Sequence, residues 1–200
     1  DGSAQVSVHE LHRLSDAESY ISFRELKNED AVSILSKHYA VQTDDKKIIS
    51  ISDNFQDYTG TPGYIPEVSI DWSFLSRKYG SLNADRILLP VVIENSHFSS
   101  QKSSRVHDVV FRTPYQEKNR LVLTVPDGYS VEFLPSPVSV DTEFASYALE
   151  YAVSGNTITI TESLRANRCI LPASEFDSYR SFVKSCNKAV QAKIVLKKNE

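Results

Sequence analysis

FASYALEYAVSGNTITITESL, residues 144–164, holds two runs of alternating apolar and polar side chains with a short turn sequence between them. Successive side chains of a strand point to opposite faces, so this alternation predicts two half-buried strands. Gly155 and Asn156 separate the runs, and a short Gly-Asn sequence in this position favours a tight turn. The stretch therefore predicts an antiparallel β-hairpin. Its apolar faces consist of Tyr147, Leu149, Tyr151 and Val153 in the first run and Ile158, Ile160 and Leu164 in the second.

Most of the remaining chain also has the pattern of strands joined by turns. Alternating runs predict strands at 5–10, 19–23, 46–52, 67–75, 106–112, 121–125, 129–134 and 194–197, together with an apolar run at 86–93. The first two of these strands are expected to pair with each other. In the third, Ile49 and Ile51 are predicted to face inward. In the fourth, the predicted buried face comprises Val68, Ile70, Trp72 and Phe74.

Two segments have the spacing of an amphipathic helix. The first begins at Asn28, a residue suited to capping, and is expected to end near residues 39–41. The second begins after Pro172, with Ser174 as its expected cap. Its apolar stripe is formed by Phe176, Tyr179, Val183, Cys186 and Val190.

The order of these elements predicts a mainly β protein. Strands that follow one another through tight turns favour antiparallel sheets, so we expect an antiparallel β-sandwich with one or two packed α-helices. The polar stretch at 95–104 is a candidate boundary. It separates an N-terminal β/α section, residues 1–95, from a β-sandwich with a C-terminal helix, residues 96–200. The sequence leaves open whether the first section belongs to the same domain.

Composition excludes some classes of partner. The net charge is −4, whereas nucleic-acid binding needs an excess of Lys and Arg on one face, so no nucleic-acid partner is expected. No run approaches the roughly 18 apolar residues of a membrane span. The basic stretch at 184–198 is interrupted by apolar residues and is interpreted as the solvent face of a packed element. The chain contains no Met, which indicates a fragment or a processed product.

Reactive side chains show no pattern of an active site. The glycines are scattered through turns, so no phosphate-binding loop is expected. His9 and His12 are expected on opposite faces of a strand, which argues against a metal site. Cys169 and Cys186 lack zinc-like spacing, and both a disulfide and two separate thiols are open alternatives. A nucleophilic Cys169 would need a neighbouring His, and no motif supplies one. The sequence therefore predicts no catalytic residue, no metal and no cofactor.

Aromatic residues gather around the Gly/Pro loop at 58–63. Trp72 and Phe74 share the predicted inward face of a strand and are interpreted as core residues. Exposed aromatic side chains can bind sugars or peptides. The candidate aromatics for a ligand or an interface are Tyr58, Tyr64, Tyr79 and Tyr115.

A series of short motifs in the C-terminal half resembles a known arrangement. Residues 121–135, LVLTVPDGYSVEFLP, resemble the segment that follows the catalytic core of bacterial transglutaminase-like proteins. The resemblance covers residues 86–198 and departs from the family pattern at 96–98. Its further motifs are RILLP at 86–90, YAVSGNTITI at 151–160, RANRCILP at 165–172, residues 176–182 and KIVLKK at 193–198.

The resemblance implies an accessory region without a reaction of its own. The Cys-His-Asp triad of such proteins lies in a core that would precede this chain, and none of its motifs occurs here. The implied partner is that transglutaminase-like core of the same polypeptide, with a peptide or glycan as a further ligand. The implied location is periplasmic, in the cell envelope or secreted. Two alternatives remain: a carbohydrate-binding module, and a thiol enzyme that uses Cys169.

Overall fold

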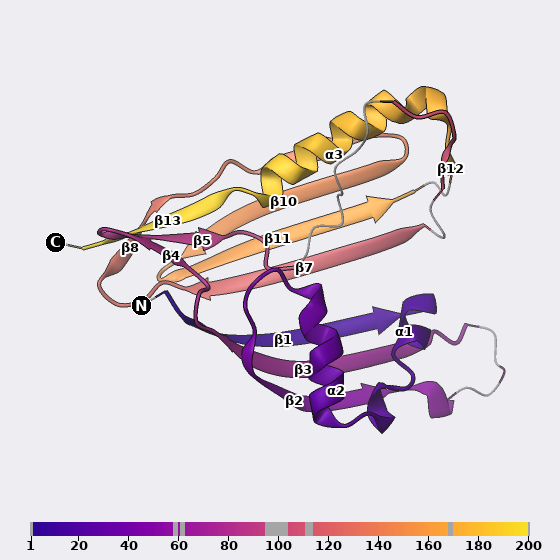
Figure 1. Ribbon diagram of the computed structural model, residues 1–200, viewed down its shortest axis with the longest axis horizontal. Helices are drawn as coiled ribbons and strands as arrows, with labels where there is room; N and C mark the ends of the chain where they lie inside the picture. The colour runs from indigo at the N-terminus through magenta and orange to yellow at the C-terminus, as the bar shows by residue number, and fades with distance from the viewer. Residues whose placement is uncertain are drawn as a thin grey trace. The chain divides into compact units, whose positions relative to one another are not determined.

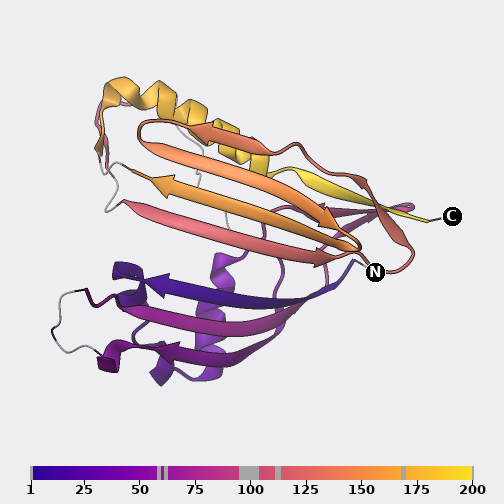
Figure 2. The same ribbon diagram turned by 180° about the vertical axis from the view of Figure 1, so that it is seen from behind.

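The computed structural model describes residues 2–57, 60, 63–94, 104–110, 114–167 and 170–199. The chain forms two compact units, Asp1–Tyr79 and Gly80–Glu200. Both units are built mainly from antiparallel strands (Figure 1; Figure 2), which confirms the predicted fold class. None of the helices in the described part of the chain is long and apolar enough to cross a membrane.

The N-terminal unit is a three-stranded antiparallel sheet with short helices. The strands lie in the order β1-β3-β2, and β1 pairs with β3 over ten residues. Helix α2 lies across one face of this sheet in both views and contacts β2 (Figure 1). The elements are β1 (Ala4–Arg13), α1 (Ser15–Ser19), the 3-10 helix η1 (Phe23–Glu25), α2 (Asn28–Leu35), η2 (Ser36–His38), β2 (Asp44–Asp53), η3 (Phe55–Asp57) and β3 (Glu67–Ser76).

The core of this unit is the inward face of β3. The four residues predicted to be buried there, from Val68 to Phe74, are each at most 1% exposed, which confirms that prediction. Tyr39 packs edge-on against Trp72, with ring centroids 5.2 Å apart. An inward face of large side chains holds the sheet to its helices because burying such a side chain contributes about 1.5–3 kcal/mol.

Three local predictions in this unit are wrong. Residues 19–23 form no strand: Tyr20 and Phe23 are buried three residues apart in a helical turn, and β1 pairs with β3 instead. Ile49 is 61% exposed while Ile48 is buried, because the register between β2 and β3 shifts between Ile48 and Ser50. Helix α2 ends at Leu35 and continues as η2, so it is shorter than expected.

The C-terminal unit is a β-sandwich. Two four-stranded antiparallel sheets, in the orders β7-β11-β10-β9 and β4-β5-β13-β8, share one hydrophobic core with helix α3, and β12 pairs with β6. The elements are β4 (Ser81–Asn83), β5 (Arg86–Pro90), β6 (Val109–Val110), β7 (Tyr115–Thr124), β8 (Tyr129–Phe133), β9 (Val138–Asp141), β10 (Ala145–Ser154), β11 (Thr157–Ala166), β12 (Ile170–Leu171), η4 (Ala173–Glu175), α3 (Phe176–Val190) and β13 (Lys193–Lys198).

The predicted hairpin is the centre of this sandwich. Strands β10 and β11 pair in register from Ala145 opposite Ala166 to Ser154 opposite Thr157. Gly155 in the turn has φ 59°, a left-handed conformation that glycine adopts without a steric penalty. Leu149 and Ile158 are fully buried, so the apolar faces of both strands point into the core as predicted, except at Val153, which is 45% exposed near the turn.

The boundary between the two units lies before β4, at Tyr79 and Gly80, rather than at residues 95–96. The reason is that β5 pairs with β13 at the other end of the chain, from Arg86 opposite Lys197 to Pro90 opposite Lys193. The predicted strand at 106–112 is described only as the two-residue β6. The polar connection at 95–104 lies outside the described residues except for Ser104.

Candidate functional site

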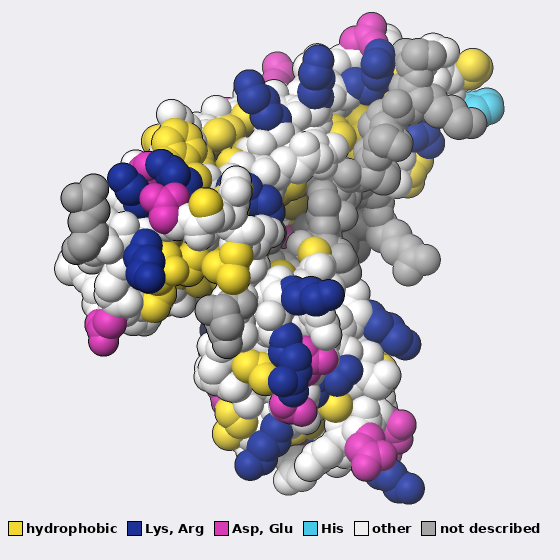
Figure 3. Space-filling model, turned by 60° about the vertical axis from the view of Figure 1, so that its left-hand side comes forward, with side chains coloured by type: hydrophobic (Ala, Val, Ile, Leu, Met, Phe, Trp, Pro, Cys, Tyr) yellow, Lys and Arg dark blue, Asp and Glu magenta, His cyan; other side chains and the backbone are white. Residues whose placement is uncertain are grey.

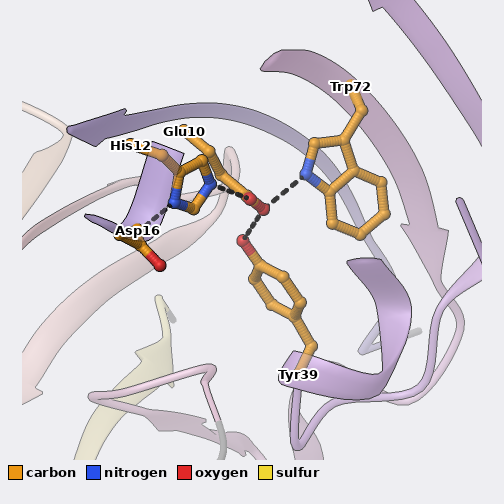
Figure 4. A network of polar contacts seen from close by, with 5 residues as sticks. All are labelled: Glu10, His12, Asp16, Tyr39 and Trp72. Carbon is orange, nitrogen blue, oxygen red and sulfur yellow. Dashed lines mark hydrogen bonds and ion pairs between the residues drawn. The ribbon is translucent and has the colours of Figure 1, made fainter. Parts of the chain in front are cut away.

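The N-terminal unit contains a network of polar side chains around Glu10 (Figure 4). Glu10 and His12 are two residues apart on β1, so both point to the inward face that β1 shares with Trp72 of β3. Asp16 comes from α1, and Tyr39 follows η2. Pairing of β1 with β3 and the turn into α1 thus bring these side chains to one place.

Glu10 is the centre of the network. Its Oε1 accepts a hydrogen bond from Trp72 Nε1 at 2.9 Å and another from the Tyr39 hydroxyl at 3.0 Å. Its Oε2 lies 3.1 Å from Nε2 of His12. The side chain of Glu10 is only 13% exposed, so these three partners replace most of the water that a carboxylate needs.

His12 is held on both of its ring nitrogens. Nδ1 lies 2.6 Å from Oδ2 of Asp16, and Nε2 faces Glu10. The ring also stacks on Tyr20, with centroids 3.8 Å apart and an interplanar angle of 19°. An imidazole placed between two carboxylates and over an aromatic face is stabilised as a cation.

The pKa values of both groups follow from these contacts. Burial alone would raise the pKa of Glu10, but hydrogen bonds with His12, Trp72 and Tyr39 outweigh it and lower the pKa. Burial alone would lower the pKa of His12, but hydrogen bonds with Asp16 and Glu10 raise the pKa to about 9. At neutral pH His12 is therefore an imidazolium that lies between the carboxylates of Glu10 and Asp16. Its Nδ1–H donates to Asp16, and its Nε2–H donates to Glu10.

This arrangement is closed to acid–base chemistry. A general base needs a lone pair within hydrogen-bond reach of a substrate proton, and its pKa should lie near the working pH. His12 has neither property, because both nitrogens already donate to carboxylates. The network instead ties β1, α1, β3 and the segment after η2 together.

A second histidine cluster lies on the opposite face of the same sheet. His9 Nδ1 contacts Asp71 Oδ1 at 2.8 Å, and Ser50 Oγ donates to Asp71 Oδ2 at 2.8 Å. The hydrogen bonds with His9 and Ser50 lower the pKa of Asp71. In a Ser-His-Asp triad the histidine lies between the other two residues, whereas here Asp71 does. His9 therefore cannot take the proton of Ser50, and the cluster has the wrong order for nucleophilic catalysis.

The C-terminal unit has a polar cluster on the inner face of its hairpin sheet. Asn119 Nδ2 donates to Glu94 at 3.2 Å and to Glu162 at 3.1 Å, and the Tyr147 hydroxyl donates to Glu162 at 2.8 Å. Nearby Cys186 is fully buried, and burial raises the pKa of its thiol to about 12. A buried thiol with that pKa stays protonated at neutral pH and is a poor nucleophile.

The described candidate aromatics differ in exposure and belong to two units. Tyr79 is only 6% exposed and offers no ring face to a ligand. Tyr64 donates its hydroxyl to the backbone oxygen of Asn54 at 3.1 Å, and Tyr115 is 37% exposed in the other unit. Tyr58 lies outside the described residues. The carbohydrate-binding alternative therefore retains two described tyrosines that belong to separate units.

The predictions for the two cysteines and for a metal site can be compared with the structure only in part. Cys169 lies outside the described residues, while Cys186 is a free, buried cysteine. No group of three or more His, Cys, Asp or Glu side chains within the described ranges could hold a metal ion. The Glu10 network was not predicted from the sequence. The available signal was that Glu10 and His12 continue the inward face of Val6 and Val8.

Comparison with known protein families identifies the C-terminal unit. Residues 85–196, more than half of the chain, match the family described as Domain of Unknown Function with solved-structure structure (DUF3858). The chain belongs to this family. No curated protein and no solved structure matches the chain. The matched region lies within the β-sandwich, and the Glu10 network lies outside it.

Proposed function

We propose that this chain is a non-catalytic accessory region of a transglutaminase-like protein in the periplasm, the cell envelope or the secreted fraction. Its role is to support the catalytic core of the same polypeptide or to help hold a protein or peptide substrate. Three features of the chain support this proposal: the structural roles of the motif residues, the enclosure of His12 and Cys186, and an apolar row on the outer face of one sheet.

The motif residues behind the transglutaminase-like resemblance have structural roles. In the Pro126-Asp127-Gly128 turn, the Tyr129 N–H donates to the Pro126 oxygen at 3.1 Å, and Gly128 has φ 80°. A glycine is needed there because the left-handed region is costly for other residues. The turn starts β8, which pairs with β13. These residues therefore build the sheet, as expected of a scaffold.

Two ionisable groups with catalytic potential, His12 and Cys186, are enclosed. His12 donates from both ring nitrogens to carboxylates, and the Cys186 thiol is fully buried. Enzymes need such groups accessible to a substrate and poised near the working pH. The chain uses them to stabilise its fold, which supports a role in binding rather than in chemistry.

An apolar row on the outer face of the β4-β5-β13-β8 sheet carries the proposal. Val195 pairs with Leu88 on one side and with Phe133 on the other. The neighbouring residues Ile194 and Leu196 are buried in the core, so the row points away from it. Phe133 is 54% exposed. Figure 3 shows hydrophobic side chains beside clustered charged ones on this side of the molecule. Leu88 and Val195 are half-buried, so Phe133 is the exposed end of the row. A partner that covers Phe133 would extend this row into a contiguous apolar contact.

The test is association of this chain with the catalytic core encoded in the same reading frame. Titration calorimetry should detect binding, and Phe133→Ser should weaken it about tenfold, since interface aromatics often contribute more than 1 kcal/mol. Ile49→Ser is the matched control, because Ile49 is 61% exposed in the other unit. A reading frame without such a core, or equal loss in both variants, refutes the proposal.

A further inference from the structure

Helix α3 and strand β13 concentrate the positive charge of the chain. Residues 176–199 contain six Lys or Arg residues and one acidic residue, Asp177, although the whole chain has a net charge of −4. The remaining residues therefore carry an excess of nine negative charges. Such a polarised distribution creates a local positive potential on an otherwise acidic protein.

The cations on α3 lie on its solvent face. Phe182, Val183 and Cys186 point into the core, while Lys184 and Lys188 are exposed. Arg180, one helical turn before Lys184, is 39% exposed and contacts Asp177 at 3.3 Å. Figure 3 shows dark-blue side chains following one another along the upper part of the molecule. The three cations are spaced four residues apart, which is about 6 Å along a helix.

The two lysines on the solvent face of α3 keep their charge unpaired within the described part of the chain. Lys184 and Lys188 form no ion pair with any residue that the structure describes. Two exposed serines lie one residue after Arg180 and Lys184: Ser181 and Ser185 donate to the backbone oxygens four residues earlier, at 2.9 and 3.0 Å. The helix face is therefore exposed, polar and cationic.

The exposed cations of α3, without exposed aromatic or large aliphatic side chains beside them, favour an acidic protein segment over a lipid or a nucleic acid as the partner. Insertion into a lipid surface requires Trp, Phe or Leu beside the cations, and binding of single-stranded nucleic acid uses aromatic side chains for stacking. The exposed side chains of α3 besides its lysines are Asp177 and three serines, and none is Trp, Phe or Leu. A spacing of about 6 Å matches carboxylates at every second residue of an extended segment or every fourth residue of a helix.

We propose that the Arg180–Lys184–Lys188 face of α3 is a docking surface for an acidic, carboxylate-bearing protein segment. Charge complementarity provides the attraction, because the exposed Lys184 and Lys188, with Arg180 beside them, meet regularly spaced carboxylates. This surface goes beyond the accessory role proposed above, and that role would stand if α3 bound nothing.

The test measures binding of a fluorescent dodeca-glutamate peptide to the full chain by anisotropy at low ionic strength. K184E/K188E should lower the affinity about tenfold, because two attractive charges become repulsive. K46E/K47E reverses two exposed lysines of β2 and should change the affinity less than about twofold. Binding should also disappear at about 1 M salt, where the screening length is about 3 Å.

Three results would overturn the assignment. The first is that the unmodified chain does not bind the peptide at low salt. The second is that K46E/K47E loses as much affinity as K184E/K188E. The third is that the chain binds phosphatidylglycerol vesicles or a single-stranded DNA oligonucleotide more tightly than the peptide, which would make the partner a lipid or a nucleic acid.

Discussion

Replacement of Glu10 by alanine should lower the free energy of unfolding of the N-terminal unit by about 3–5 kcal/mol, the range for breaking a buried ion pair. The change removes the acceptor for Trp72 Nε1, for the Tyr39 hydroxyl and for one nitrogen of His12. Trp72 is fully buried, and Tyr39 is 8% exposed. Water therefore reaches the stranded donors poorly, and each unsatisfied buried donor costs about 1–3 kcal/mol.

Glu10→Gln separates the charge of Glu10 from its hydrogen bonds. The amide oxygen can still accept from Trp72 and Tyr39, but the amide nitrogen would meet the N–H of a protonated His12. His12 must then lose the proton on Nε2 or lose its contact with residue 10. The expected loss is intermediate, about 1–3 kcal/mol, and the pKa of His12 should fall.

Urea denaturation followed by tryptophan fluorescence is the appropriate assay. Trp72 is the single tryptophan of the chain and lies in the N-terminal unit, so its emission reports that unit alone. Glu67→Ala is the matched control: Glu67 pairs with Arg13 on the surface at 2.8 Å, and its loss should cost less than about 1 kcal/mol. A cost below about 1 kcal/mol for Glu10→Ala would refute the structural role of the network.

Three further predictions follow from the same contacts. Because the pKa of His12 is raised from 6.5 to about 9, its contribution to stability is complete below pH 6.5 and is lost as pH rises through 9. The free energy of unfolding from urea titrations should fall by up to about 3 kcal/mol across this window, but not in His12→Gln. Gly155→Ala should destabilise the sandwich by about 1–2 kcal/mol in urea titrations followed by circular dichroism, and an unchanged midpoint would contradict the left-handed turn. In a Cys169→Ser variant, Cys186 should resist iodoacetamide until urea unfolds the chain; rapid native labelling would show that the thiol is accessible.

Local patterns predicted the fold where a strand's partner is its neighbour in sequence. The β10–β11 hairpin is encoded by alternation and by a turn at Gly155, all within about twenty residues. The inward face of β3 was equally clear, because large apolar residues recur at every second position from Val68 to Phe74. In both cases the pattern and the burial follow the same period.

Long-range partners explain what the sequence did not predict. Residues 5–10 were expected to pair with 19–23, whereas β1 pairs with β3, more than fifty residues further along the chain. The Glu10 network depends on the same pairing: Trp72 lies 62 residues from Glu10, and Tyr39 lies 29 residues away. The alternation along β1 shows that Glu10 and His12 face inward, but it does not show which distant side chains they meet, so the network itself could not be predicted.

The protonation state of His12 tests most directly whether the polar centre of this chain is closed and structural. Long-range proton–nitrogen NMR correlations of the ring should show both nitrogens protonated through pH 8, with a midpoint at about 9. A ring that titrates near 6.5 and has an unprotonated Nε2 at neutral pH would leave His12 free to act as a base, and it would contradict the structural role of the network.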